Sequence, residues 1–158
     1  MKAVVFDVDG VLVDSSSRFR ACLDEVGLED LSKARGLKRR LFWDCFLSER
    51  YVYLDRVRED MASLARGYAS RGYRIIVVTG RPESMKRITV EQLRAAGIED
   101  AEIYFRKRGD YRSDSEYKVD VVRALVNRYE IEAVYDDSEE VVKALKREFP
   151  EIKVILVT

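Results

Sequence analysis

The chain has 158 residues, of which 47% are apolar and 10% aromatic, so it can bury a core of its own and is not a disordered segment. Its 29 basic and 29 acidic residues cancel, which leaves no overall field to attract nucleic acid or a membrane. It contains no histidine, which excludes histidine acid/base catalysis, phosphohistidine intermediates and histidine-ligated metals. A metal site would therefore be built from hard oxygen ligands.

The two cysteines, Cys22 and Cys45, form no CxxC motif and are too few for a zinc site. Leu28 and Tyr51 stand where a cysteine phosphatase would carry its arginine. We therefore expect buried, reduced thiols in a cytoplasmic protein. No apolar run approaches the roughly 18 residues that span a bilayer, and the acidic N-terminal stretch is unlike a signal peptide. We expect no membrane partner, and the oligomeric state stays open.

The first predicted strand, Lys2–Phe6, runs directly into Asp7, Val8, Asp9 and Gly10. Alternate residues of an extended chain point to one side, so Asp7 and Asp9 share a side if the strand continues. Gly10 then permits a turn that a side chain would obstruct. We expect at least one of these carboxylates to serve chemistry rather than structure.

The interval 15–72 is longer than a single crossover helix needs. Helical patterns fit Ser17–Val26 and a longer segment near the end of the interval, and Leu41–Leu47 between them is dense in apolar and aromatic residues. Either a helical layer on the sheet or a small cap over the carboxyl ends of the strands explains the interval, and the region around Trp43 is a cap or an interface. We expect a single domain over residues 1–158, with 15–72 as its helical insert or small cap.

Four further strands alternate with three amphipathic helical segments. The near-continuous β-branched run that begins at Arg74 is typical of a strand buried on both faces. Alternating strands and helices predict a doubly wound, parallel α/β sheet. The strands are predicted at Arg74–Val78, Ala101–Phe105, Ala133–Tyr135 and Ile152–Val157, and the helices at Ser84–Ala96, Tyr117–Tyr129 and Ser138–Phe149.

Polar side chains follow each of the first four predicted strands at its carboxyl end, where open α/β sheets bind their ligands. They include carboxylates, a hydroxyl and several cations, a mixture suited to holding a metal ion and an anion together. In chain order the set is Asp7 and Asp9, then Thr79-Gly80-Arg81, then Arg106-Lys107-Arg108-Gly109-Asp110, then Lys118 at the start of the next helix, and Asp136-Asp137.

These residue types suit phosphoryl transfer. Asp7 is the candidate nucleophile that attacks phosphorus and forms an aspartyl-phosphate. Asp9 is the candidate general acid for the departing alkoxide, and then the base for the water that hydrolyses the intermediate. Thr79, Gly80 and Lys118 are the candidate phosphate-binding residues that hold the phosphoryl oxygens in the transition state.

A candidate Mg²⁺ site is formed by oxygens of Asp7, Asp136 and Asp137 together with the backbone carbonyl of Asp9. A metal there would offset the repulsion between these carboxylates and the substrate phosphate. Which of Asp136 and Asp137 ligates directly stays open. An EF-hand starting at Asp7 lacks the glycine and glutamate that its loop requires, and the Walker pattern GxxxxGK[ST] is absent.

In this order the motifs resemble the four motifs of the haloacid dehalogenase superfamily, and the resemblance covers essentially the whole chain. It implies a Rossmann-like fold with strand order 3-2-1-4-5. It also implies a phosphatase, because a second aspartate two positions after the nucleophile is the phosphatase version of the first motif. The matching residues are Asp7-Val8-Asp9-Gly10-Val11, Thr79-Gly80-Arg81, Lys118 and Asp136-Asp137.

The stretch Arg106–Lys118 is in turn similar to the 3′-phosphatase domain of phage polynucleotide kinase-phosphatases, as is the short insert. With no P-loop in the chain, only the phosphatase half is implied. Arg81, Arg106 and Arg112 are candidate substrate-binding residues, because cations after the third strand can hold a flanking phosphodiester of DNA or RNA. Ordinary solvated charges explain the loop arginines equally well.

Three functions stay open at this point. The leading prediction is a Mg²⁺-dependent phosphomonoesterase that removes 3′-phosphates from polynucleotide ends. The alternatives are a phosphatase of small metabolites or mononucleotides and, from another class, a catalytically inactive phosphate-binding module. The segment Lys38-Arg39-Arg40 beside Trp43 can grip a nucleic-acid strand by charge and stacking, or be the surface of a helix next to a buried patch.

Overall fold

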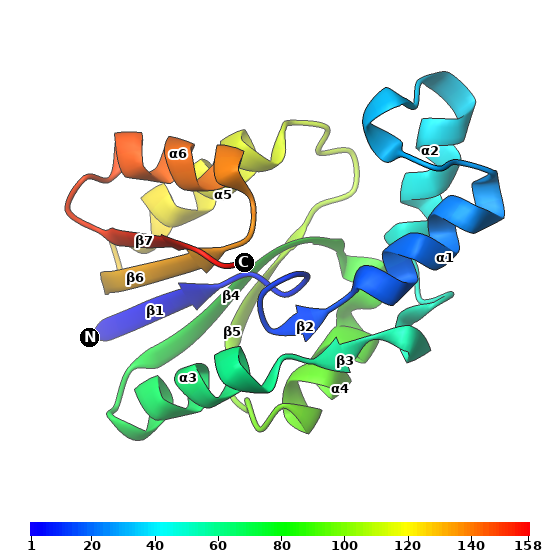
Figure 1. Cartoon of the computed structure of the whole chain (residues 1–158). Helices are drawn as coiled ribbons and strands as arrows, with labels where there is room; N and C mark the ends of the chain where they lie inside the picture. Colours follow the sequence, from blue (N-terminus) through cyan, green and yellow to red (C-terminus); the bar gives the residue numbers. More distant parts are fainter.

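The computed structural model describes every residue from Met1 to Thr158. Five parallel strands form its main sheet in the order β5-β4-β1-β6-β7 (Figure 1). Numbered along the chain, these five strands stand in the order 3-2-1-4-5, and the architecture is the expected Rossmann-like α/β sheet. The strands are β1 (Lys2–Phe6), β4 (Arg74–Pro82), β5 (Glu102–Arg106), β6 (Glu130–Asp136) and β7 (Lys153–Leu156).

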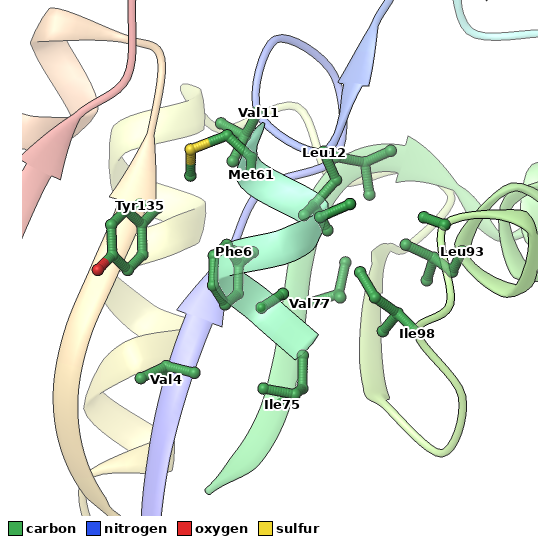
Figure 2. Packing of buried hydrophobic residues seen from close by; sticks show 14 of the residues in the cluster. Val4, Phe6, Val11, Leu12, Met61, Ile75, Val77, Leu93, Ile98 and Tyr135 are labelled. Carbon is green, nitrogen blue, oxygen red and sulfur yellow. The ribbon is translucent and has the colours of Figure 1, made fainter. Parts of the chain in front are cut away.

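The central strand β1 is buried on both faces because its apolar residues alternate between two layers of helices. Val4 and Phe6 pack in the layer of α3 and α4, which Figure 2 shows from close by. Ala3 and Val5 pack in the opposite layer, formed by α5 and α6. None of the helices is long and apolar enough to cross a membrane. Their bounds are α3 (Glu59–Ser70), α4 (Lys86–Ala95), α5 (Asp114–Leu125) and α6 (Glu139–Glu148).

The residues between β1 and β4 divide into two parts. The helix α3 packs its apolar side chains on the sheet, as an ordinary crossover helix does. In contrast, α1 (Ser16–Val26) and α2 (Gly36–Phe46) pack on each other around a small apolar cluster of their own, beyond the carboxyl ends of the strands (Figure 1). Within the expected range 15–72, only residues 15–55 stand apart from the sheet, and we call these residues the insert.

The insert leaves the sheet and returns to it through one short antiparallel pair. The strand β2 (Val13–Asp14) pairs with β3 (Arg56–Val57), so both connections of the insert lie side by side. The N–H of Arg58 also donates to the carbonyl of Leu12 at 2.9 Å. These contacts hold the base of the insert next to the turn that follows β1. Short 3₁₀ turns complete the chain path at Leu31–Lys33, Val52–Leu54 and Glu83–Met85.

Cys22 of α1 and Cys45 of α2 form a disulfide, so the expectation of reduced thiols is wrong. The two residues are 23 positions apart, and the packing of α1 against α2 brings their Cα atoms to 5.8 Å. That separation lies within the range that a disulfide requires. The sequence spacing could not indicate this pairing, because it depends on how two helices of the insert cross.

One helix begins earlier than its apolar pattern indicates, and this matters for the site. Lys118 was expected at the opening of its helix, but it lies in the second turn of α5. The cause is a cap at Ser113, whose hydroxyl accepts a hydrogen bond from the N–H of Glu116. The extra turn carries Lys118 to a buried position beside the end of β1.

Candidate active site

The carboxyl edge of the sheet and the insert enclose an open cleft of about 1350 Å³. Polar residues at or just after the carboxyl ends of β1, β4, β5 and β6 line this cleft together with Lys118 and with residues of α1 and α2. Parallel strands bring their carboxyl ends to one edge, which is why residues far apart in the sequence meet here. The predicted site residues that line the cleft are Asp7, Asp9, Thr79, Gly80, Arg81, Arg106, Arg112, Lys118 and Asp137, while Asp136 is buried behind them against Lys118.

Three carboxylates gather at the ends of β1 and β6. Asp7, Asp136 and Asp137 each offer an oxygen, and these oxygens lie within 4.8 Å of one another. Lys118 joins the group, because its Nζ lies 2.9 Å from Asp7 Oδ2 and 2.6 Å from Asp136 Oδ2. Backbone N–H groups donate to the other oxygens of Asp7 and Asp136 at 2.7 and 2.9 Å, respectively, and fix their orientation.

This carboxylate cluster holds more negative charge than one lysine balances. Burial raises the pKa of Asp7 well above its usual range; the Lys118 ammonium opposes this rise and the neighbouring carboxylates add to it. Desolvation, followed by the charge of Asp136, raises the pKa of Asp137 to about 6. Burial alone would lower the pKa of Lys118, but Asp7 and Asp136 outweigh it and raise the pKa above its usual value. Three convergent hard oxygens with uncompensated charge are a donor set that fits Mg²⁺.

Gly10 makes the close approach of the two strand ends possible. Its φ of +81° lies in the left-handed region that side chains disfavour. A Cβ at this position would lie 2.0 Å from Oδ2 of Asp137. The glycine is therefore required twice, once for the turn after β1 and once to leave room for the carboxylate.

Asp9 points to a different set of partners from Asp7. Its Oδ1 accepts from Arg18 Nη2 at 2.6 Å and from Arg81 Nη2 at 2.7 Å, and its Oδ2 accepts from Arg81 Nε at 3.0 Å. Burial would raise the pKa of Asp9, but the hydrogen bonds and charges of the two arginines outweigh burial and lower it. The Asp9 side chain is therefore outside the carboxylate cluster, and the chain turns after Asp7 instead of continuing as a strand.

Two residues of this arrangement, Arg18 and Asp55, escaped the sequence reasoning. Both belong to the insert, and Arg18 Nη1 donates to Asp55 Oδ2 at 3.0 Å. The Arg18 side chain is fully buried and the Asp55 side chain is 1% exposed, so with Asp9 and Arg81 they form a buried network of two positive and two negative groups. The available signal was a cation on the apolar side of a helix, because Arg18 precedes the buried Cys22 by one helical turn.

Thr79 and Gly80 line the cleft near the carboxyl end of β4. Thr79 is 1% exposed, and its Oγ1 accepts from the N–H of Arg81 at 3.1 Å, which leaves the hydroxyl hydrogen free to donate to an anion. At Gly80 a Cβ would meet Oδ1 of Asp114 at 3.3 Å. In this part of the cleft the Thr79 hydroxyl, a hydrogen-bond donor, therefore lies next to the Gly80 backbone, which carries no side chain.

Arg106 and Arg112 line the cleft, but carboxylates already bind both. Arg106 Nη1 donates to Asp114 Oδ1 at 2.7 Å. Arg112 makes a two-point contact with Asp110 at 3.0 and 2.8 Å and also bonds Asp120. The hydrogen bonds from Arg112 lower the pKa of Asp110 to about 2, so this pair is ionised. These arginines are therefore partly neutralised by their own loop and helix.

A family model described as the polynucleotide kinase PNKP phosphatase domain matches residues 37–157. Among solved structures, a chain of the Pnkp1/Rnl/Hen1 complex is 21% identical with a TM-score of 0.70, and the match covers 99% of this chain and 45% of that chain. The chain therefore spans less than half the length of that relative.

Two bacterial proteins of known structure are also similar to this chain. A haloacid dehalogenase-like family hydrolase of Streptococcus pneumoniae is 16% identical with a TM-score of 0.68, over 98% of this chain and 83% of that one. Protein Tyrosine Kinase A of Mycobacterium tuberculosis is 21% identical with a TM-score of 0.69, over 98% and 82%. At such identities the likeness establishes the fold, and a fold hosts more than one activity.

Proposed function

The chain belongs to the family of polynucleotide kinase PNKP phosphatase domains and is a phosphatase of the haloacid dehalogenase type, and from this we propose that it is a Mg²⁺-dependent phosphomonoesterase that works through an aspartyl-phosphate on Asp7. The observation that carries the proposal is the cluster of Asp7, Asp136 and Lys118, which opens into the cleft beside Thr79. It combines a nucleophile, an anion-binding cation and hard oxygen ligands in one place.

In the first proposed step, an oxygen of Asp7 forms a bond to phosphorus and the bond to the ester oxygen breaks. Asp9 gives the departing alkoxide its proton. Arg18 and Arg81 hold Asp9 ionised before the substrate binds, so Asp9 must first receive this proton. The substrate supplies it, because a phosphate monoester has a second pKa of about 6 and can bind as its monoanion. Lys118 and the Thr79 hydroxyl hold the phosphoryl oxygens while charge shifts.

In the second proposed step, water attacks the phosphorus of the aspartyl-phosphate and Asp9 takes its proton. The bond between phosphorus and Asp7 breaks, which releases inorganic phosphate and the free carboxylate. Mg²⁺ held by Asp7, Asp136 and Asp137 would supply the charge that offsets the repulsion between these carboxylates and the phosphate.

Replacing Asp7 with asparagine tests the nucleophile. Asp7→Asn is expected to abolish Mg²⁺-dependent hydrolysis of an aryl phosphate, because an amide does not form the acyl-phosphate bond. The control is Asp24→Asn, an exposed aspartate of α1 that does not line the cleft. Activity retained by Asp7→Asn would remove Asp7 from the role of nucleophile.

We propose 3′-phosphorylated ends of DNA or RNA as the substrate. The family supports this, and so does the cleft, whose volume of about 1350 Å³ exceeds that of ordinary small-molecule pockets. One observation favours the alternative of a mononucleotide or small metabolite, namely that Arg106 and Arg112 are already paired with carboxylates.

A substrate panel decides between these two classes. The kcat/KM values are compared for 3′-phosphorylated oligonucleotides, 5′-phosphorylated oligonucleotides and free nucleotides under one condition. We expect the highest value for the 3′-phosphorylated oligonucleotide. A clear preference for free nucleotides would end the polynucleotide proposal and leave the phosphatase intact.

A further inference from the structure

The half-buried Trp43 of α2 lines the same cleft as Asp7. Its aromatic contacts are perpendicular: the ring centroids of Phe42 and Phe46 lie 5.1 and 5.9 Å away, both at 83° to the indole plane. These contacts hold the indole in place, and no aromatic side chain stacks parallel on it. Trp43 thus offers a fixed aromatic surface in the cleft that also contains Asp7.

Four cations on the walls of this cleft lack a carboxylate partner. Arg20 of α1 and Arg39 and Arg40 of α2 are exposed and form no ion pair, and the same holds for Lys107 in the loop after β5. Arg39 donates only to a backbone carbonyl, at 3.3 Å. In contrast, Arg106 and Arg112 form ion pairs with Asp114 and Asp110, respectively. Two cleft carboxylates, Asp14 and Asp44, also form no ion pair, so these four cations outnumber the unpaired carboxylates of the walls.

We propose that Trp43 and these free cations form a subsite for the single strand that precedes the reacting phosphate. One base of the strand stacks on the indole, while Arg39, Arg40 and Lys107 contact phosphodiesters on either side of the cleft. The inference rests on the proposed function, because the strand enters the subsite only when its terminal phosphate lies at Asp7. It requires an unpaired strand, since a base inside a duplex cannot stack on a side chain.

A comparison of two substrates tests the subsite. For Trp43→Ala, the ratio of kcat/KM on a 3′-phosphorylated oligothymidylate to kcat/KM on an aryl phosphate is expected to fall about 10-fold, the usual loss for a base–aromatic stack. The loss should lie in KM for the oligonucleotide, and Trp43→Phe should restore most of it. The matched control is Tyr53→Ala, which removes a 72% exposed aromatic of the same insert that does not line the cleft. An unchanged ratio in Trp43→Ala would overturn the subsite.

Trp43 is the single tryptophan of the chain, so its fluorescence reports the stack without altering the insert. In Asp7→Asn, which we expect to bind without turnover, the 3′-phosphorylated oligothymidylate should quench this fluorescence and inorganic phosphate should not. The midpoint of the titration should shift to higher concentration as salt is added. Absence of quenching at saturation would also overturn the subsite.

The failure of the subsite and the failure of the proposed function give different results. Hydrolysis of the 3′-phosphorylated oligonucleotide without quenching, and with an unchanged ratio in Trp43→Ala, would overturn the subsite and keep the proposed substrate. Quenching by the strand in Asp7→Asn, together with no hydrolysis of the 3′-phosphorylated oligonucleotide by the unmodified protein, would support the subsite and overturn the proposed substrate.

Discussion

At the scale of single residues, Gly10 connects the shape of the turn to the carboxylate cluster. We expect Gly10→Ala to displace Asp137, because its Cβ would stand 2.0 Å from Oδ2 of that carboxylate. The concentration of Mg²⁺ that gives half-maximal phosphatase activity should rise about 10-fold or more, as for other changes that misplace a ligand. Titration of activity with Mg²⁺ measures this shift.

Gly72→Ala is the matched control for that experiment. Gly72 has a φ of +87°, close to that of Gly10, but a Cβ there would meet nothing within 4 Å. It therefore carries the same backbone strain without the contact to a carboxylate. Equal Mg²⁺ requirements in the two variants would contradict the steric explanation.

Arg18 is a second residue whose loss should be felt beyond its own position. Arg18→Met leaves Asp9 and Asp55 buried with fewer cations, so the free energy of unfolding at neutral pH is expected to fall by about 3 kcal/mol. The lowered pKa of Asp9 gives stability that is present above the unfolded pKa and lost as the pH falls through the folded pKa. The difference in free energy of unfolding between Arg18→Met and the unmodified protein should therefore become smaller as the pH is lowered.

Urea denaturation at several pH values measures the effect of Arg18→Met. Arg87→Met is the control, because the Arg87–Glu91 pair is exposed and should contribute less than about 0.5 kcal/mol. The buried network would lose its assigned role if both variants changed stability equally.

The contrast between these residues shows what the sequence could reveal. Asp7, Thr79 and Asp136 could be placed together because each ends an apolar run, and parallel strands end at one edge. Arg18 and Asp55 could not, because they reach Asp9 through the packing of the insert, which no local pattern determines. The proposed chemical roles of all these residues remain predictions.

At the scale of elements, the disulfide makes α1 and α2 one unit. Replacing both cysteines, Cys22→Ala with Cys45→Ala, is expected to lower the free energy of unfolding by about 3 kcal/mol, the loop-closure value for a loop of this length. Hydrogen exchange should accelerate more in α1 and α2 than in β1 and β4, because without the disulfide the insert can also open locally. A reducing agent should reproduce both effects in the unmodified protein, and unchanged exchange in α2 would contradict this prediction.

Elements of the sheet were predictable and those of the insert were less so. The strands bury continuous apolar runs, which a sequence pattern can reveal, whereas the strand order was an expectation from the resemblance to the haloacid dehalogenase superfamily. The insert instead consists of two short helices and two 3₁₀ turns of three residues each, and a disulfide links the two helices. In so small a unit, long-range contacts outweigh local preference.

At the scale of the whole molecule, the carboxylate cluster should couple stability to Mg²⁺ and pH. Because the pKa values of Asp7 and Asp137 are raised in the folded protein, these groups make the metal-free protein less stable as the pH rises from the unfolded pKa through the folded one. Mg²⁺ opposes this loss. At about 100 times its Kd it should add about 3 kcal/mol, which for this size is a rise in Tm of about 5–10 °C.

The rise in Tm on adding Mg²⁺ should be larger near pH 7.5 than near pH 5. The pKa of Asp137 is about 6, so at lower pH protons compete with the metal for this carboxylate. Differential scanning calorimetry at the two pH values measures this difference. Asp137→Asn should reduce the rise, and a rise of equal size at both pH values would contradict the assignment of the metal to this cluster.

The salt bridges from Arg18 and Asp55 to the network around Asp9 also limit how such a chain can diversify. A chimera that received the insert of a relative would acquire new walls for its cleft, but its Asp9 would be left with Arg81 alone unless the donated segment carried an arginine and an aspartate at corresponding places. A grafted insert must therefore keep the arginine and aspartate that contact this network, whereas its residues that only line the cleft can differ. Substitutions at Trp43, which lines the cleft and takes no part in these salt bridges, would change the wall of the cleft without removing a partner of Asp9.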